Sequence, residues 1–149
     1  MAFRFPLQAL RRVRAIYERR EGQRLAALTQ QLNFAQKQLT ALKQGRMEEA
    51  GALATGMQRG MSCAEVQFQV LISSLRLRHI EAVARLVEDL NRQHQRQLSA
   101  YRQARQKLEV IERLRDRQLA AYRRTQARRD QQQATDMFLL RSPTANDRQ

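Results

Sequence analysis

The sequence predicts an all-α protein: an antiparallel two-helix coiled coil, or long α-helical hairpin, whose second helix is longer than the first. No proline lies between Pro6 and Pro143, and four of the five glycines fall within residues 45–60. Proline and glycine are the strongest breakers of regular structure, so two long stretches flanking one glycine-rich window indicate two helices joined by a reversal. Aromatic residues make up only 5% of the chain and tryptophan is absent. This composition suits a single coiled-coil domain over residues 1–149 better than a globule with a thick core.

The first helix is expected at about residues 6–48. Pro6 suits a first helical turn, where its ring presets the helical φ angle. Apolar residues then follow at alternating spacings of three and four, which is the seam of a coiled coil: Leu25, Leu28, Leu32, Ala35, Leu39 and Leu42. Upstream, Leu7, Leu10 and Tyr17 continue this stripe if Arg14 and Glu21 are tolerated in it. The resulting spacing contains a stutter, which would locally relax the supercoil.

The reversal is expected at about residues 49–61, and a capping box marks the start of the second helix. The Ser62 hydroxyl can accept from the Glu65 backbone N–H, while the Glu65 carboxylate can accept from Ser62. Met61 and Val66 flank this box at the positions of a hydrophobic staple. Cys63 has no neighbour in the sequence that suggests a reactive or metal-binding role.

The second helix is expected at about residues 63–140. Its seam is predicted, with slips of one residue, at Val66, Val70, Leu77, Ile80, Ala84, Val87, Leu90, His94, Leu98, Tyr101, Leu108, Ile111, Leu119 and Tyr122. Residues 62–103 match the first helix in length, so residues 104–140 are expected to have no partner within the chain. This excess carries an apolar stripe, and residues 102–129 hold ten Lys and Arg against three acids. Such a stripe marks a surface for another protein. The tail, 142–149, is expected to be disordered.

Charge and motif content narrow the function. The net charge of +14 predicts attraction to nucleic acid, an anionic membrane or an acidic protein surface. His79 and His94 stand 15 residues apart without companion ligands, the glycine spacing fits no phosphate-binding loop, and a thin hairpin offers no pocket for a catalytic set. We therefore expect no enzyme activity, metal or cofactor. One cysteine, no signal peptide and no apolar stretch of 18 residues predict a cytoplasmic protein without membrane insertion.

Two functions other than binding a different protein remain open from the residues alone. A basic coiled coil could bind nucleic acid, although the arginines are spread along both arms instead of forming the single block of a basic zipper. A structural protein could instead self-associate through its excess length. We expect no nucleic-acid partner.

Four segments resemble the FliJ family of the bacterial flagellar type III export apparatus. They are FRFPLQALRRVR near the N-terminus, QLTALK in the first arm, SCAEVQFQVLISSL after the reversal, and LEVIERLRDRQLAAYRRTQARRDQQQATDMF near the C-terminus. The last is the most specific, because heptads alone look alike in unrelated proteins. The resemblance implies an antiparallel coiled coil similar to the central stalk subunit of rotary ATP synthases. The related stalk proteins of injectisomes share this architecture and remain an alternative.

The resemblance also implies partners: the hexameric export ATPase FliI, the export-gate protein FlhA and export chaperones, with peripheral association at the inner membrane. The residues that it places at the ATPase are Leu7, Leu10, Leu108, Leu114, Asp116, Arg117, Gln118, Tyr122, Asp130 and Asp136. The residues that match the gate-binding surface are Gln38, Leu42, Phe68, Leu71 and Leu75. Gly45 and Glu49 stand where relatives carry aromatic residues.

Overall fold

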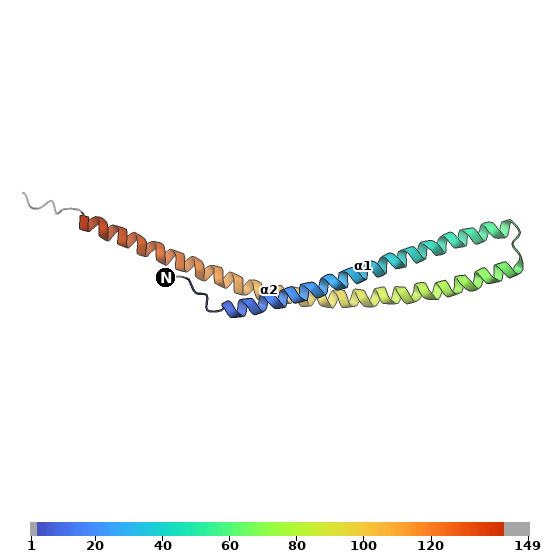
Figure 1. Ribbon diagram of the computed structural model, residues 1–149, viewed down its shortest axis with the longest axis horizontal. Helices are drawn as coiled ribbons and strands as arrows, with labels where there is room; N and C mark the ends of the chain where they lie inside the picture. Colours follow the sequence, from blue (N-terminus) through green and yellow to red (C-terminus); the bar gives the residue numbers. More distant parts are fainter. Residues whose placement is uncertain (1–2, 142–149) are drawn as a thin grey trace, which may run out of the picture. The chain divides into compact units, whose positions relative to one another are not determined.

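The computed structural model describes residues 3–141, and these form two α-helices and no strand (Figure 1). Helix α1 spans Gln8–Gln58 and helix α2 spans Cys63–Arg141, with 51 and 79 residues. The all-α class and the longer second helix are confirmed, whereas the expected disordered tail, 142–149, lies outside the described residues. The chain divides into two compact units. Unit 1 holds residues 3–17 and 104–141 of the described part, and unit 2 holds residues 18–103.

Helix α1 is longer than the sequence predicted. It begins at Gln8, two residues after Pro6, and it continues to Gln58, ten residues past the predicted end at 48. The reversal therefore comprises residues 59–62 in place of the expected 49–61. Gly45 and Gly51 lie inside the helix, and each costs only about 1 kcal/mol relative to alanine. An ion pair between Glu49 and Arg76 of α2 holds this part of the helix against its partner.

The reversal is short because each helix end is capped by its own residues. The Met61 N–H donates to the Gly56 carbonyl at 3.3 Å and the Gly60 N–H donates to the Met57 carbonyl at 3.2 Å, which is the bond pattern of a Schellman motif. Gly60 has a φ of 90°, the left-handed conformation that such a motif requires. The predicted capping box is confirmed at the other side: the Ser62 N–H donates to the Glu65 carboxylate at 2.8 Å, and the Glu65 N–H donates to the Ser62 hydroxyl at 3.3 Å.

The seam between the helices follows an unbroken heptad. The seam positions a and d of α1 are Leu7, Arg11, Arg14, Glu18, Glu21, Leu25, Leu28, Leu32, Ala35, Leu39 and Leu42, of which all but Leu7 are buried or half-buried. In α2 they are Ile80, Val83, Val87, Leu90, His94, Gln97, Tyr101, Ala104, Leu108, Ile111, Arg115, Gln118 and Tyr122, all buried or half-buried.

The predicted seam is confirmed over residues 25–42, but the predicted stutter is not found. Glu18 occupies the seam position that Tyr17 was expected to fill, and Tyr17 is 53% exposed. In α2, Val70 and Leu77 also lie outside the seam and are exposed. Continuous alternation of three and four keeps one face of each helix toward the other, and this continuity outweighs the gain from burying single apolar side chains.

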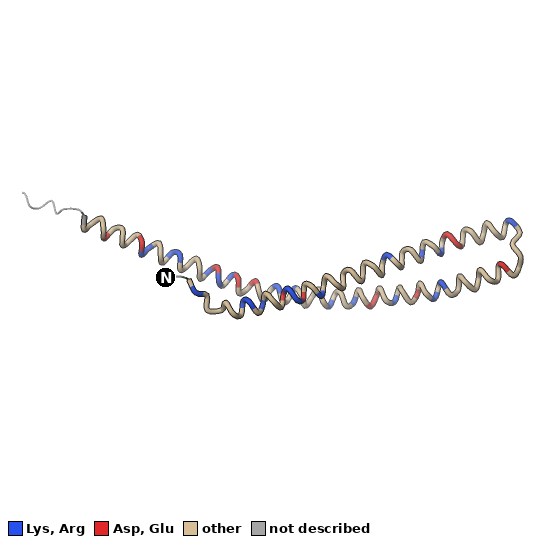
Figure 2. The backbone as a smooth tube through the Cα atoms, in the orientation of Figure 1, with Lys and Arg blue, Asp and Glu red and all other residues tan. Residues whose placement is uncertain are grey.

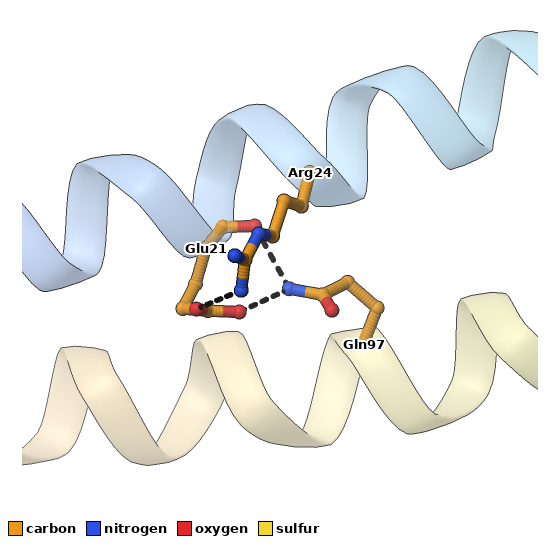
Figure 3. A network of polar contacts seen from close by, with 3 residues as sticks. All are labelled: Glu21, Arg24 and Gln97. Carbon is orange, nitrogen blue, oxygen red and sulfur yellow. Dashed lines mark hydrogen bonds and ion pairs between the residues drawn. The ribbon is translucent and has the colours of Figure 1, made fainter.

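Polar side chains connect the two helices in part of unit 2. Gln97 donates to the Glu21 carboxylate and, at 3.2 Å, to the Glu21 backbone carbonyl, while Arg24 pairs with the same carboxylate at 2.9 Å (Figure 3). Two further cross-helix contacts lie beside this one: the Tyr101 hydroxyl donates to Glu18 at 3.2 Å, and His94 lies 3.1 Å from the Thr29 hydroxyl. Specific polar pairs in a seam fix the register of the helices at some cost in stability.

In unit 1, residues 3–17 pack along residues 104–122 of α2. Phe5, Leu108 and Ile111 are buried at 5–8% exposure, and the half-buried Arg11, Arg115 and Gln118 occupy nearby positions of the same seam. The rings of Phe3 and Tyr122 lie 5.6 Å apart at 48°. The expectation that residues 104–140 have no partner within the chain was therefore wrong for residues 104–122. The physical reason is the later end of α1. Because α1 continues to Gln58 before the reversal, more of the chain before α2 is available to pair with it, and residues 3–17 lie beside residues 104–122 instead of ending near residue 103.

Candidate interaction surfaces

The C-terminal end of α2, residues 123–140, is exposed at every position except the half-buried Gln126. Four consecutive apolar side chains end this segment: Met137, Phe138, Leu139 and Leu140, the last 87% exposed. Successive residues of a helix point about 100° apart, so these four surround the helix instead of forming one stripe. The segment also carries Arg123, Arg124, Arg128 and Arg129 against two aspartates. It therefore offers an apolar, basic end to a partner.

The ten residues assigned to the ATPase divide into two groups. Three belong to the seam of unit 1: Leu108 is only 5% exposed, Gln118 is half-buried, and Tyr122 packs on Phe3. These three lie in the seam, where they contribute to holding the two helices together and are less accessible than the other seven. The other seven are exposed: Leu7, Leu10, Leu114, Asp116, Arg117, Asp130 and Asp136.

The residues assigned to the export gate all lie in unit 2. Phe68, Leu71 and Leu75 are exposed, and their spacing of three and four places them on one face of α2. Gln38 is exposed on α1, whereas Leu42 is half-buried in the seam. The Phe68–Leu75 stripe is therefore the accessible part of this set. Glu49 is engaged with Arg76.

Sequence reasoning missed several exposed apolar residues of unit 1. Val13, Ile16 and Val110 were assigned to no surface, and the Met137–Leu140 run was not singled out, yet all are exposed. Placing the seam at residues 11, 14 and 18 would have shown that Val13 and Ile16 point away from it. The continuity of the heptad from Leu25 backwards was the available signal.

Basic residues are spread along both helices, with fewer acidic residues among them (Figure 2). The described residues of unit 1 hold fourteen Lys and Arg against five Asp and Glu, a net +9, whereas unit 2 holds thirteen against eight, a net +5. Positive charge is therefore concentrated in unit 1 without forming a single block.

Chemistry at a metal or a nucleophile finds little support in residues 3–141. This part of the chain contains no group of three His, Cys, Asp or Glu side chains placed to hold a metal ion. Cys63 is exposed at the start of α2, and His94 is engaged with Thr29. Among the polar contacts, those of Glu18, Glu21, Thr29 and Glu49 join the two helices, and many others lie within one helix.

The sequence model of the FliJ family, described as flagellar FliJ protein, matches residues 3–141. The chain belongs to the FliJ family. Neither the curated proteins nor the solved structures provide a match. As a FliJ-family member, the chain is a flagellar protein related to protein export, from a family of stalk-like structural proteins that is not known for enzyme activity. Over the described part of this FliJ-family chain, neither helix contains a segment long and apolar enough to span a bilayer.

Proposed function

We propose that this protein is a stalk of the flagellar export apparatus, which binds the hexameric export ATPase FliI through unit 1. The observation that carries the proposal is the set of exposed apolar and charged side chains of unit 1, including Leu114 and the Met137–Leu140 run, in a chain of an export family. The seam beneath them, with Leu108 and Ile111 buried, would keep two helices together as one rigid element. Such an element can transmit force or a change of shape between partners without catalysing a reaction.

We propose further that the Phe68, Leu71 and Leu75 stripe of unit 2, with Gln38 and Leu42 on α1, binds the gate protein FlhA. These contacts would bring the protein to the inner membrane peripherally, through its partners. The stalk would thereby couple ATP hydrolysis on the ring to export at the gate and assist the handling of export chaperones. No nucleic-acid partner is proposed, and steeply salt-dependent binding to arbitrary duplex DNA would contradict this.

The ATPase contact is tested by substituting exposed leucines, because these changes leave the seam intact. Leu10→Asp and Leu114→Asp replace side chains that are 40% and 38% exposed. Burying the exposed part of one leucine contributes about 1 kcal/mol, and a buried unpaired carboxylate costs more, so each change should weaken ATPase capture by at least roughly tenfold. The measurement is capture of the purified ATPase hexamer on the immobilised full chain.

Leu86→Asp is the matched control, because Leu86 is half exposed on the same helix but lies in unit 2. It should capture the hexamer as the wild type does. Equal capture by Leu10→Asp, Leu114→Asp and the wild type would refute the proposed ATPase contact. For the gate, Leu71→Asp should reduce capture of the cytoplasmic domain of FlhA while leaving ATPase capture unchanged; the reverse pattern would contradict the assignment.

A further inference from the structure

The two flanks of the helix pair in unit 1 differ in character. Around each helix the heptad positions run c, g, d, a, e, b, so c and g lie beside d, whereas e and b lie beside a. In an antiparallel pair, the g positions of both helices line one flank and the e positions line the other. We define the apolar flank of unit 1 as the exposed apolar side chains at d or at the neighbouring c and g positions, which are Leu7, Leu10, Val13, Tyr17, Val110 and Leu114.

Charge separates the two flanks as well. The three acidic residues of 104–122, Glu109, Glu112 and Asp116, all occupy positions b and e, on the other flank. There they are balanced by arginines: Glu109 pairs with Arg113 at 2.7 Å and Glu112 lies 4.0 Å from Arg11.

The apolar flank holds basic residues without acidic ones. Arg14, Lys107 and Arg117 occupy its c, d and g positions, and no Asp or Glu of residues 3–17 or 104–122 does. This side of unit 1 is therefore apolar and positive.

The side chains of the apolar flank differ in how far they are exposed. Leu7, Leu10 and Leu114 are 37–40% exposed, while Val13, Tyr17 and Val110 are 47–66% exposed. Exposed leucines beside the seam of two packed helices are the kind of surface on which a third helix packs in a helical bundle. An amphipathic helix docks on such a surface through residues spaced three and four apart.

We propose that the apolar flank binds an amphipathic α-helix whose apolar stripe is bordered by Asp or Glu, so that partner and unit 1 form a three-helix layer. The apolar stripe of the partner would cover Leu7, Leu10 and Leu114, and its carboxylates would face Arg14, Lys107 and Arg117. A second copy of this chain is disfavoured as occupant, because each unit 1 carries a net +9. The proposal rests on the proposed function, since four of these side chains (Leu7, Leu10, Leu114 and Arg117) belong to the proposed ATPase contact, and it names the kind of element that would bind them.

The test uses the full chain and labelled 21-residue peptides. The first peptide has leucine at heptad positions a and d and glutamate at e and g. The second has lysine in place of the glutamates, and the third has serine in place of the leucines. Fluorescence anisotropy at moderate salt should show the first peptide binding at least about tenfold more tightly than either of the others. Leu10→Asp and Leu114→Asp should each weaken it by about tenfold or more, and Leu86→Asp, which changes the net charge equally, by less than about twofold.

Each of the next four outcomes would overturn the proposal. Equal binding of the serine peptide would mean that net charge alone attracts the peptide, and an unchanged affinity in Leu10→Asp would remove the flank from the contact. Vesicles of phosphatidylcholine and phosphatidylserine (3:1) could displace the peptide. If they do, and if Leu10→Asp loses vesicle binding, the occupant of the apolar flank is a membrane surface. A dimer seen by sedimentation and lost in Leu10→Asp would make it a second copy. Because no ATPase is present, ring capture without peptide binding overturns this inference alone, and peptide binding without ring capture overturns the proposed function alone.

Discussion

Replacing Gly45 and Gly51 with alanine should stabilise the protein, because both residues lie inside α1. A Cβ atom added at either position meets no atom within 4 Å, so neither change creates a clash. Alanine is about 0.8–1.0 kcal/mol more favourable than glycine in a helix interior, and the double variant should gain about 2 kcal/mol. For a chain of this length that corresponds to a rise in Tm of about 4–8 °C. Thermal unfolding followed by circular dichroism at 222 nm measures it.

Gly60→Ala is the matched control, because it introduces the same methyl group at a residue with a φ of 90°. A side chain in that left-handed conformation costs about 1–2 kcal/mol, so Tm should fall. In the double variant, hydrogen exchange of the backbone amides of residues 49–58 should slow as well. A neutral or destabilising Gly51→Ala together with a harmless Gly60→Ala would refute the location of the reversal at residues 59–62.

Two further predictions concern the capping box and the polar contacts of the seam. Ser62→Ala should cost about 1 kcal/mol by denaturant unfolding. Hydrogen bonds from the Ser62 N–H, and then from its hydroxyl, lower the pKa of Glu65. The stabilisation by this carboxylate should therefore be complete above the ordinary pKa of glutamate and disappear as the pH falls through the lowered value. A Glu65→Gln variant that kept the wild-type pH dependence in this acidic range would contradict that. Gln97→Leu should cost about 1–2 kcal/mol, because it leaves the half-buried Glu21 carboxylate without its cross-helix donor. The double variant Glu21→Leu/Gln97→Leu should recover the stability lost in Gln97→Leu. Urea unfolding of the single and double variants, arranged as a double-mutant cycle, measures this. No recovery in the double variant would mean that the two side chains do not interact.

Local signals were sufficient to predict both helices and the bounds of α2, but not the end of α1. Ser62 and Glu65 are three residues apart, so the capping box could be recognised from the sequence and lies where it was expected. The end of α1 could not be placed in the same way, because glycine only weakens a helix. Packing against α2, including the Glu49–Arg76 ion pair, helps to decide how many glycines a helix tolerates.

The candidate surfaces were predictable in part. The C-terminal half of α2 was expected to carry an exposed interaction surface, and residues 123–140 are indeed exposed. Leu108 and Tyr122 were assigned to the same surface because they are apolar and regularly spaced. They are covered by residues 3–17, about a hundred positions away in the chain, and spacing within one helix carries no information on such a contact.

The sequence by itself determined that this protein is a pair of long helices, the second longer than the first, with a heptad seam over residues 25–42. Helix propensity and hydrophobic period act over a few neighbouring residues, so they can be read without the partner helix. Only the tertiary structure decided which face of the first helix is the seam near its start. Glu18 and Glu21 are stabilised there by Tyr101 and Gln97, whose contribution exists only once the second helix has folded back. Because these charged residues occupy the seam, Leu10 and Tyr17 remain on the outside, where a partner can reach them.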